Sequence, residues 1–204
     1  LWTIRSMLRF SREPSWKQGL KVGLFSGDWE VWTEGQSPVF PDHCDHFIDA
    51  RIHKAQSPEV SQVWAGVPES LLVDELERWL EDLRSKDERF LAYLKLFRPH
   101  MPYYTPASTP DGWAPPFLPQ ADGITVTDFS PAAGRLPPLR NRYDNAIHYA
   151  DHQLGRVLAY LKRSGLDRDT AIVLVADHGE AWGQHGWYNH GHHNFEEVLQ
   201  VPLI

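Results

Sequence analysis

The sequence has only one cysteine and no long apolar run. Cys44 excludes an intramolecular disulfide framework and leaves the redox compartment open. No apolar stretch approaches the roughly 20 residues of a membrane span. The chain opens on Leu1 without a Met or a signal-like segment and closes on residues 201–204, which look like the start of a strand. Both ends therefore look cut from a longer chain, and we expect an internal fragment.

Several motifs are also absent. The sequence has no phosphate-binding glycine loop ending in Lys-Ser or Lys-Thr, no dinucleotide glycine fingerprint, no Gly-x-Ser-x-Gly elbow and no paired cysteines for zinc. A net charge of -7 argues against a general nucleic-acid partner. With 204 residues and 42% apolar composition, the chain can bury an ordinary globular core.

Hydrophobic periodicity predicts a fold of the α/β class. Apolar runs predict strands over residues 19–27, 89–97 and 170–176, and spacings of three and four predict helices over 68–86 and 139–164. Alternating strands and helices are typical of a mostly parallel sheet with crossover helices. Most of the sixteen prolines lie in residues 99–138, which predicts a long loop or lid there.

The apolar run over residues 171–176 ends abruptly on Asp177 and His178. We expect this strand to be buried on both faces and its carboxyl end to carry chemistry, because open α/β sheets bind ligands at that edge. A carboxylate and an imidazole are both ligands for a divalent cation. The alternative is an ordinary helix cap followed by a surface histidine. Gly179 would let the chain turn sharply after this pair.

Five of the eleven histidines lie between residues 178 and 193. His185 and His190 are candidates for contacting an anion or a metal, although each alone is equally typical of a solvated loop. His100 follows another predicted strand and would reach the same edge of a parallel sheet, or it is simply structural. Glu180 either orients a neighbouring imidazole or begins a helix.

Four segments together resemble the sulfatase branch of the alkaline phosphatase superfamily. They are residues 98–103 (Arg-Pro-His-Met-Pro-Tyr), 143–156, 176–186 (from Ala-Asp-His-Gly-Glu to Gly-Gln-His-Gly) and 190–204. The resemblance implies a mostly parallel sheet sandwiched between helices in three layers. It makes residues 1–204 a single, partial catalytic domain truncated at both ends.

Carried over by position, the resemblance makes Asp177 and His178 metal ligands and makes His100 and His190 hydrogen-bond donors to the sulfate or phosphate oxygens, with His185 as a further substrate-binding residue. The implied cofactor is a divalent metal ion, with Ca²⁺ favoured and Mn²⁺ or Zn²⁺ as alternatives. These roles suit a transition state whose charge spreads over equatorial oxygens.

The nucleophile departs from the family pattern. Sulfatases proper use a formylglycine made within a Cys/Ser-x-Pro-x-Arg motif, which the sequence around Cys44 does not match. Thr3 lies roughly where family members carry their nucleophile, and a threonine there would favour phosphoryl chemistry. The lysine that the family carries after its second strand is also missing, because Asp28 stands in that region.

The leading hypothesis is a metal-dependent hydrolase of sulfate esters whose substrate is a small-molecule or glycan ester, with the fragment alone inactive. One alternative is a phosphodiester or phosphonate hydrolase or a phosphoethanolamine transferase of the same superfamily, with membrane association of the full-length protein. Another is a non-catalytic, anion-binding relative. The location stays open, and the resemblance favours an extracytoplasmic one.

Overall fold

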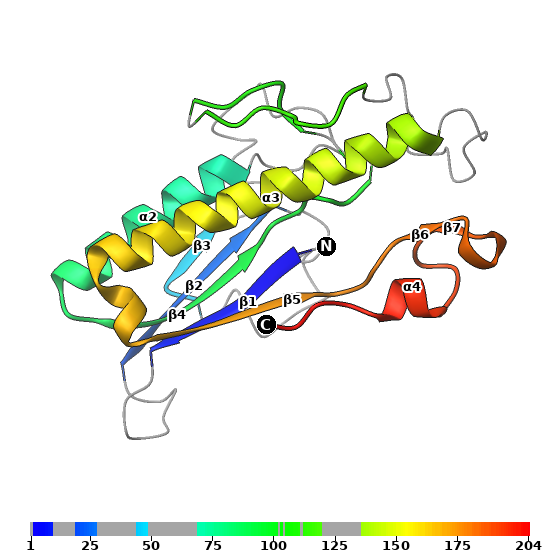
Figure 1. Ribbon diagram of the computed structural model, residues 1–204. Helices are drawn as coiled ribbons and strands as arrows, with labels where there is room; N and C mark the ends of the chain where they lie inside the picture. Colours follow the sequence, from blue (N-terminus) through cyan, green and yellow to red (C-terminus); the bar gives the residue numbers. More distant parts are fainter. Residues whose placement is uncertain are drawn as a thin grey trace.

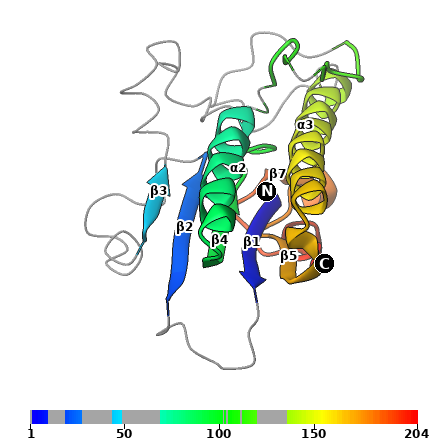
Figure 2. The ribbon, with the colours of Figure 1, turned by 90° about the vertical axis from the view of Figure 1, so that its left-hand side faces the viewer.

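The computed structural model describes residues 2–9, 19–27, 44–48, 69–101, 103, 105–110, 112–119 and 136–204, the first range for its backbone only. One five-stranded sheet organises these residues, and its order is β3-β2-β4-β1-β5. The strands are β1 (Trp2–Arg9), β2 (Leu20–Ser26), β3 (His46–Ile48), β4 (Arg89–Lys95) and β5 (Thr170–Ala176). Figure 2 shows them side by side in this order.

The sheet is mostly parallel, as the sequence predicts. Strand β2 pairs parallel to both β3 and β4, whereas β1 lies antiparallel between β4 and β5. Strand β5 therefore runs in the same direction as β4, and the two share a carboxyl edge. The antiparallel strand β1 was not predicted, because its mixed polar and apolar residues carry no clear alternation.

Helix α2 (Glu69–Ser85) forms where periodicity predicts it. Its apolar residues recur at spacings of three and four, so that Leu72, Leu76 and Leu80 line one face and are fully buried. An acidic residue in the first turn and Arg84 in the last complement the helix dipole.

Helix α3 (Leu136–Ser164) begins three residues before the predicted start at Leu139. The early start is compatible with Pro137 and Pro138, because the first turn of a helix does not use its backbone N–H groups. Gly165 follows the helix with a φ of 75°, a left-handed conformation that suits a helix end.

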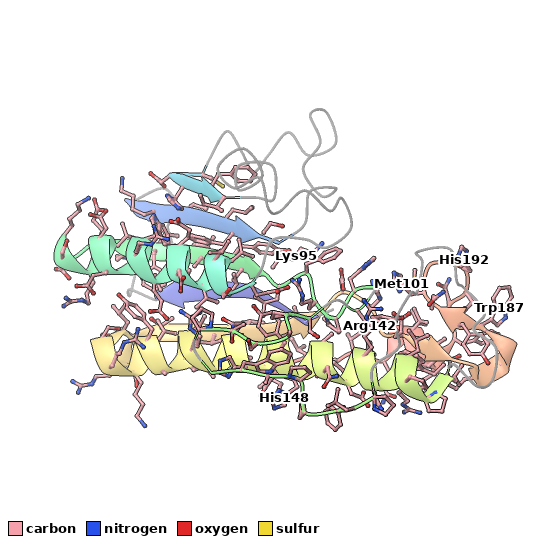
Figure 3. The ribbon with its side chains drawn as sticks, turned by 90° about the horizontal axis from the view of Figure 1, so that it is seen from above. Lys95, Met101, Arg142, His148, Trp187 and His192 are labelled. Atoms are coloured by element: carbon pink, nitrogen blue, oxygen red, sulfur yellow. The ribbon has the colours of Figure 1, made fainter. Side chains whose placement is uncertain are left out.

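Both long helices lie on the same face of the sheet (Figures 1 and 3). A core of aliphatic and aromatic side chains from α2, α3, β2 and β4 fills the space between them. The α/β class is confirmed, and the described residues supply the sheet and one helical layer. No helix in this described part is long and apolar enough to cross a membrane.

The expectation that β5 is buried on both faces is wrong. Every residue of β5 except Ala176 is only partly buried, because β5 stands at the end of the described sheet and only Ile172 and Leu174 pack on the core. The predicted strand after residue 200 is reduced to a single antiparallel bridge from Leu203 to Val175.

Irregular structure fills much of the remainder. The described residues of 99–119 contain no helix or strand, and residues 120–135 of the predicted loop lie outside the described part. After β5, the histidine-rich segment forms a small hairpin of β6 (Ala181–Trp182) and β7 (Tyr188–Asn189). A one-turn helix, α4 (Glu196–Leu199), follows.

Candidate active site at the carboxyl edge of the sheet

Two loops meet where β4 and β5 end. Because these strands run in the same direction, residues 96–103 and residues 177–200 leave the sheet at one edge (Figure 1). Met101 and His192, one from each loop, lie toward the same end of the molecule (Figure 3). The His100 ring lies 5.2 Å from the His190 ring, so the two loops are in contact.

Three imidazoles gather at this edge. His178 stacks on His190 with ring centres 3.9 Å apart, and His100 meets the same ring edge to face. Asp177, His178 and His190 also line a pocket of about 290 Å³. The structure therefore brings together four of the residues that the sequence singled out, from segments almost 80 positions apart.

Backbone carbonyls fix the tautomers of two of these histidines. Nδ1 of His178 donates to the Gly179 carbonyl over 2.8 Å, and Nδ1 of His100 donates to the Met101 carbonyl over 2.7 Å. A carbonyl only accepts, so Nδ1 carries the proton and Nε2 presents its lone pair in the neutral ring. Burial is the largest cause that lowers the pKa of His178, which favours the neutral form that a metal requires.

Asp177 and His178 can reach one ion together. Their Oδ1 and Nε2 atoms lie 3.8 Å apart, and metal–ligand distances of about 2.0–2.6 Å let both atoms contact a single divalent cation. Across the described ranges, no group of three or more His, Cys, Asp or Glu side chains gathers as a complete site. The described residues thus fit part of a metal shell, with one oxygen and one nitrogen donor.

Gly179 is required for a reason other than the predicted sharp turn. A Cβ at this position would lie 2.2 Å from the Glu197 carbonyl oxygen, and the Gly179 N–H donates to the Val198 carbonyl over 2.7 Å. The backbone of α4 therefore packs directly against the residue after His178. Only glycine permits this close approach.

Glu180 links the two loops. One carboxylate oxygen accepts from Nδ1 of His190 over 3.0 Å, and the other accepts from the Tyr103 hydroxyl over 2.9 Å. Burial, followed by the nearby Glu180 charge, raises the pKa of Tyr103, so the hydroxyl keeps its proton. The sequence offered an orienting role for Glu180 as one alternative. It assigned no role to Tyr103, which appeared only as the last residue of the family-like segment 98–103.

Two other histidines of this segment differ in whether they line the pocket. Nδ1 of His185 donates to the Glu197 carboxylate over 3.1 Å, and the His185 ring stacks on Phe195. His185 is not among the residues that line the pocket. Its substrate-binding role stays a prediction. His193 and Asn194 also line the pocket, and neither was predicted as a site residue. A larger pocket of about 450 Å³ between α3 and β5 is mostly apolar and includes none of the predicted site residues.

The nucleophile candidate Thr3 and the non-matching Cys44 lie in different places. The Thr3 backbone is in β1, in register with Lys95 and Val175, which places it near the carboxyl edge of the sheet. Its role as nucleophile stays a prediction. Cys44 precedes β3, and burial raises the pKa of its thiol, which disfavours the reactive thiolate.

Comparisons with known proteins identify relatives of this chain. The profile of the family described as Sulfatase matches residues 17–204, a range that excludes Thr3. Mouse (Mus musculus) iduronate 2-sulfatase is 28% identical over 174 residues, covering 69% of this chain and 31% of that enzyme. An Escherichia coli phosphatidylethanolamine transferase is 39% identical over 69 residues, covering 32% of this chain and 13% of that protein.

A solved structure shows the same fold. The phosphonate monoester hydrolase of Agrobacterium radiobacter superposes with a TM-score of 0.58 at 20% identity, covering 91% of this chain and 50% of that one. The chain spans about a third of the length of the sulfatases that it matches over most of its own length. Members of this family and superfamily generally use divalent metal ions. Because the family profile covers nearly all of the sequence, the chain belongs to the sulfatase family.

Proposed function

We propose that this chain carries part of the active site of a metal-dependent sulfatase, which hydrolyses sulfate esters of a small molecule or glycan. The observation that carries the proposal is the meeting of Asp177, His178, His100 and His190 at one edge of the sheet. The similarity to mouse iduronate 2-sulfatase supports the same function.

Each residue has a distinct role in this proposal. Asp177 and His178 hold a divalent ion, with Ca²⁺ favoured over Mn²⁺ and Zn²⁺, and the bound ion supplies positive charge beside the ester oxygens. His100 and His190, when protonated, donate from Nε2 to sulfate oxygens and to the leaving group. Thr3 is the proposed nucleophile within this sequence, and His185 is a further contact for the substrate.

The test uses the full-length protein with aryl sulfates, in the presence and absence of Ca²⁺, Mn²⁺ or Zn²⁺. We expect metal-dependent turnover that falls by about 100-fold or more in Asp177→Ala, since a ligand to the ion is removed. The control is Asp167→Ala, an exposed carboxylate at the other end of β5. Turnover retained in Asp177→Ala would remove this site assignment.

A second candidate is phosphoryl chemistry, as a phosphodiester or phosphonate hydrolase or a phosphoethanolamine transferase. The match to the transferase and the threonine at position 3 favour it. Phosphate diester and phosphonate monoester substrates belong in the same assay. Turnover of these esters at a higher kcat/KM than aryl sulfates would establish the second candidate over the first.

For residues 1–204 alone we propose weak metal affinity and no measurable turnover, because two ligands seldom hold a divalent ion tightly. Isothermal titration with Ca²⁺, Mn²⁺ and Zn²⁺ measures the affinity directly. Submicromolar binding would contradict the proposal. Binding of sulfate without turnover by the full-length protein would instead identify a non-catalytic relative.

A further inference from the structure

We infer that Glu180 is a positioning residue that sets the tautomer and the orientation of His190, and that Tyr103 holds Glu180 in place. The inference deepens the proposed function, on which it rests for the role of His190. It concerns three side chains from two loops, joined by hydrogen bonds of 3.0 Å and 2.9 Å through the two oxygens of one carboxylate.

The His190 ring has little freedom to turn. Its Nδ1 atom faces the Glu180 carboxylate, His178 stacks on one face at 3.9 Å, and His100 meets it edge to face at 5.2 Å. Turning the ring over would place a carbon against the carboxylate oxygen and lose the hydrogen bond. The arrangement therefore reserves Nε2 for a ligand in the pocket that His190 lines.

The carboxylate is itself fixed from the opposite side. The Glu180 side chain is only 5% exposed, so water cannot readily replace its protein partners. Tyr103, which donates to it, is almost fully buried and packs against Tyr143 of α3 and Trp182 of β6. Tyr103 also adopts a left-handed backbone with a φ of 58°, an uncommon conformation that the surrounding contacts sustain.

This geometry assigns the protons during ester cleavage. A carboxylate accepts from Nδ1–H, so Nδ1 keeps its proton and only Nε2 gains or loses one. The nucleophile hydroxyl releases its proton to water, and as its oxygen bonds to sulfur, the bond from sulfur to the leaving oxygen breaks and that oxygen takes the electron pair. The leaving oxygen then receives the Nε2 proton of His190, which becomes neutral with Nδ1–H retained.

A tautomer measurement tests the inference without any turnover. In the chain labelled with ¹⁵N-histidine at about pH 8, where imidazoles are neutral, we expect His190 to be protonated at Nδ1. Glu180→Gln should retain this tautomer, because the amide oxygen still accepts, whereas Glu180→Ala should shift His190 toward Nε2–H. His190→Gln assigns the signal among the eleven histidines. An unchanged Nδ1–H tautomer in Glu180→Ala would overturn the inference.

A leaving-group series in the full-length enzyme supplies the second readout. We expect Glu180→Ala to lower kcat by about 10–100-fold for phenyl sulfate and by less for 4-nitrophenyl sulfate, whose leaving group needs little protonation. Tyr103→Phe, which keeps the carboxylate but frees one oxygen, should give a smaller loss of the same pattern. Glu196→Gln, an exposed charge in α4, is the control.

The two readouts separate the inference from the function on which it rests. An equal loss with both aryl sulfates in Glu180→Ala, or in Tyr103→Phe if the alanine variant does not fold, would reduce Glu180 to a structural role and overturn the inference. If the parent protein shows no turnover but the tautomer shift occurs as expected, the proposed sulfatase activity is contradicted. The positioning of His190 by Glu180 is then still supported.

Discussion

The core beneath α2 and α3 and the histidine-rich edge of the sheet are built in different ways. In the core, side chains such as Leu72, Leu76 and Leu80 are fully buried against other apolar groups, and burial alone fixes them. At the edge, His178 and His190 are partly exposed and are fixed by hydrogen bonds to a carbonyl and a carboxylate. Stability therefore resides mainly in the first region and ligand geometry in the second.

One buried ion pair joins the two regions. Glu69, the first residue of α2, accepts from both the backbone N–H and the guanidinium of Arg98, which stands two residues before His100. Arg98 also lies over the Tyr149 ring of α3 at 5.6 Å. The helical layer and the loop that carries His100 are thus connected through two charged groups with almost no exposure to water.

The largest effect should come from breaking this connection. Glu69→Ala removes the carboxylate from a buried guanidinium and should lower the free energy of unfolding by about 3–5 kcal/mol. Urea denaturation measures the loss. Asp82→Ala, which removes an exposed partner of Lys86, should cost far less, because water solvates both charges of a surface pair. Equal costs for the two variants would show that the junction is no stronger than a surface pair.

Core packing should give the next largest effect. Leu76→Ala opens a cavity in a fully buried site and should lower the free energy of unfolding by about 2–5 kcal/mol. His190→Ala should lower that free energy by less, about 1–2 kcal/mol, while lowering turnover, because its ring is partly exposed but its loss leaves one oxygen of the buried Glu180 carboxylate without its partner. A His190→Ala protein as unstable as Leu76→Ala would contradict the division between the two regions.

Adding a side chain at Gly179 should lower the free energy of unfolding by a smaller amount. In Gly179→Ala the new methyl group meets the Glu197 carbonyl, so α4 and its preceding loop must shift, at a cost of about 1–3 kcal/mol. Urea denaturation and metal titration of the full-length protein should both report the change. Gly155→Ala is the control, because its Cβ would meet no atom within 4 Å. Equal stability in the two variants would exclude the close approach.

Periodicity predicted the core well and the edge only in part. The 3.6-residue pattern locates α2 because burial acts on every third or fourth residue, and the strand pattern locates β4 and β5. It could not show that β5 lies at the end of the described sheet or that β1 runs antiparallel, since both depend on pairings between distant segments.

At the edge, the position of Asp177 and His178 directly after a strand could be predicted, because both follow an apolar run. Tyr103 could not, because a tyrosine that donates across 77 positions leaves no local pattern. The close approach at Gly179 is a contact with α4 and is equally invisible in the sequence.

Acid sensitivity gives the smallest expected effect and a further test of the comparison. His46 of β3 packs against Phe25 and Trp79, and among the described residues its buried Nε2 has no hydrogen-bond partner. Burial lowers its pKa below the ordinary value of about 6.5, with Glu75 opposing and Arg78 adding to the shift. The unfolded chain therefore binds a proton first as the pH falls below about 6.5, and stability is lost through the lower folded pKa.

Replacing His46 by phenylalanine keeps an aromatic ring in the core and removes the proton site. We expect His46→Phe to flatten the fall in unfolding free energy between about pH 7 and pH 5, measured by urea denaturation, whereas the exposed His192→Gln should leave it unchanged. A slope that disappears with His46 would assign part of the acid sensitivity to the core. A slope that persists would assign it to the imidazoles of the edge, where protonation also competes with metal binding.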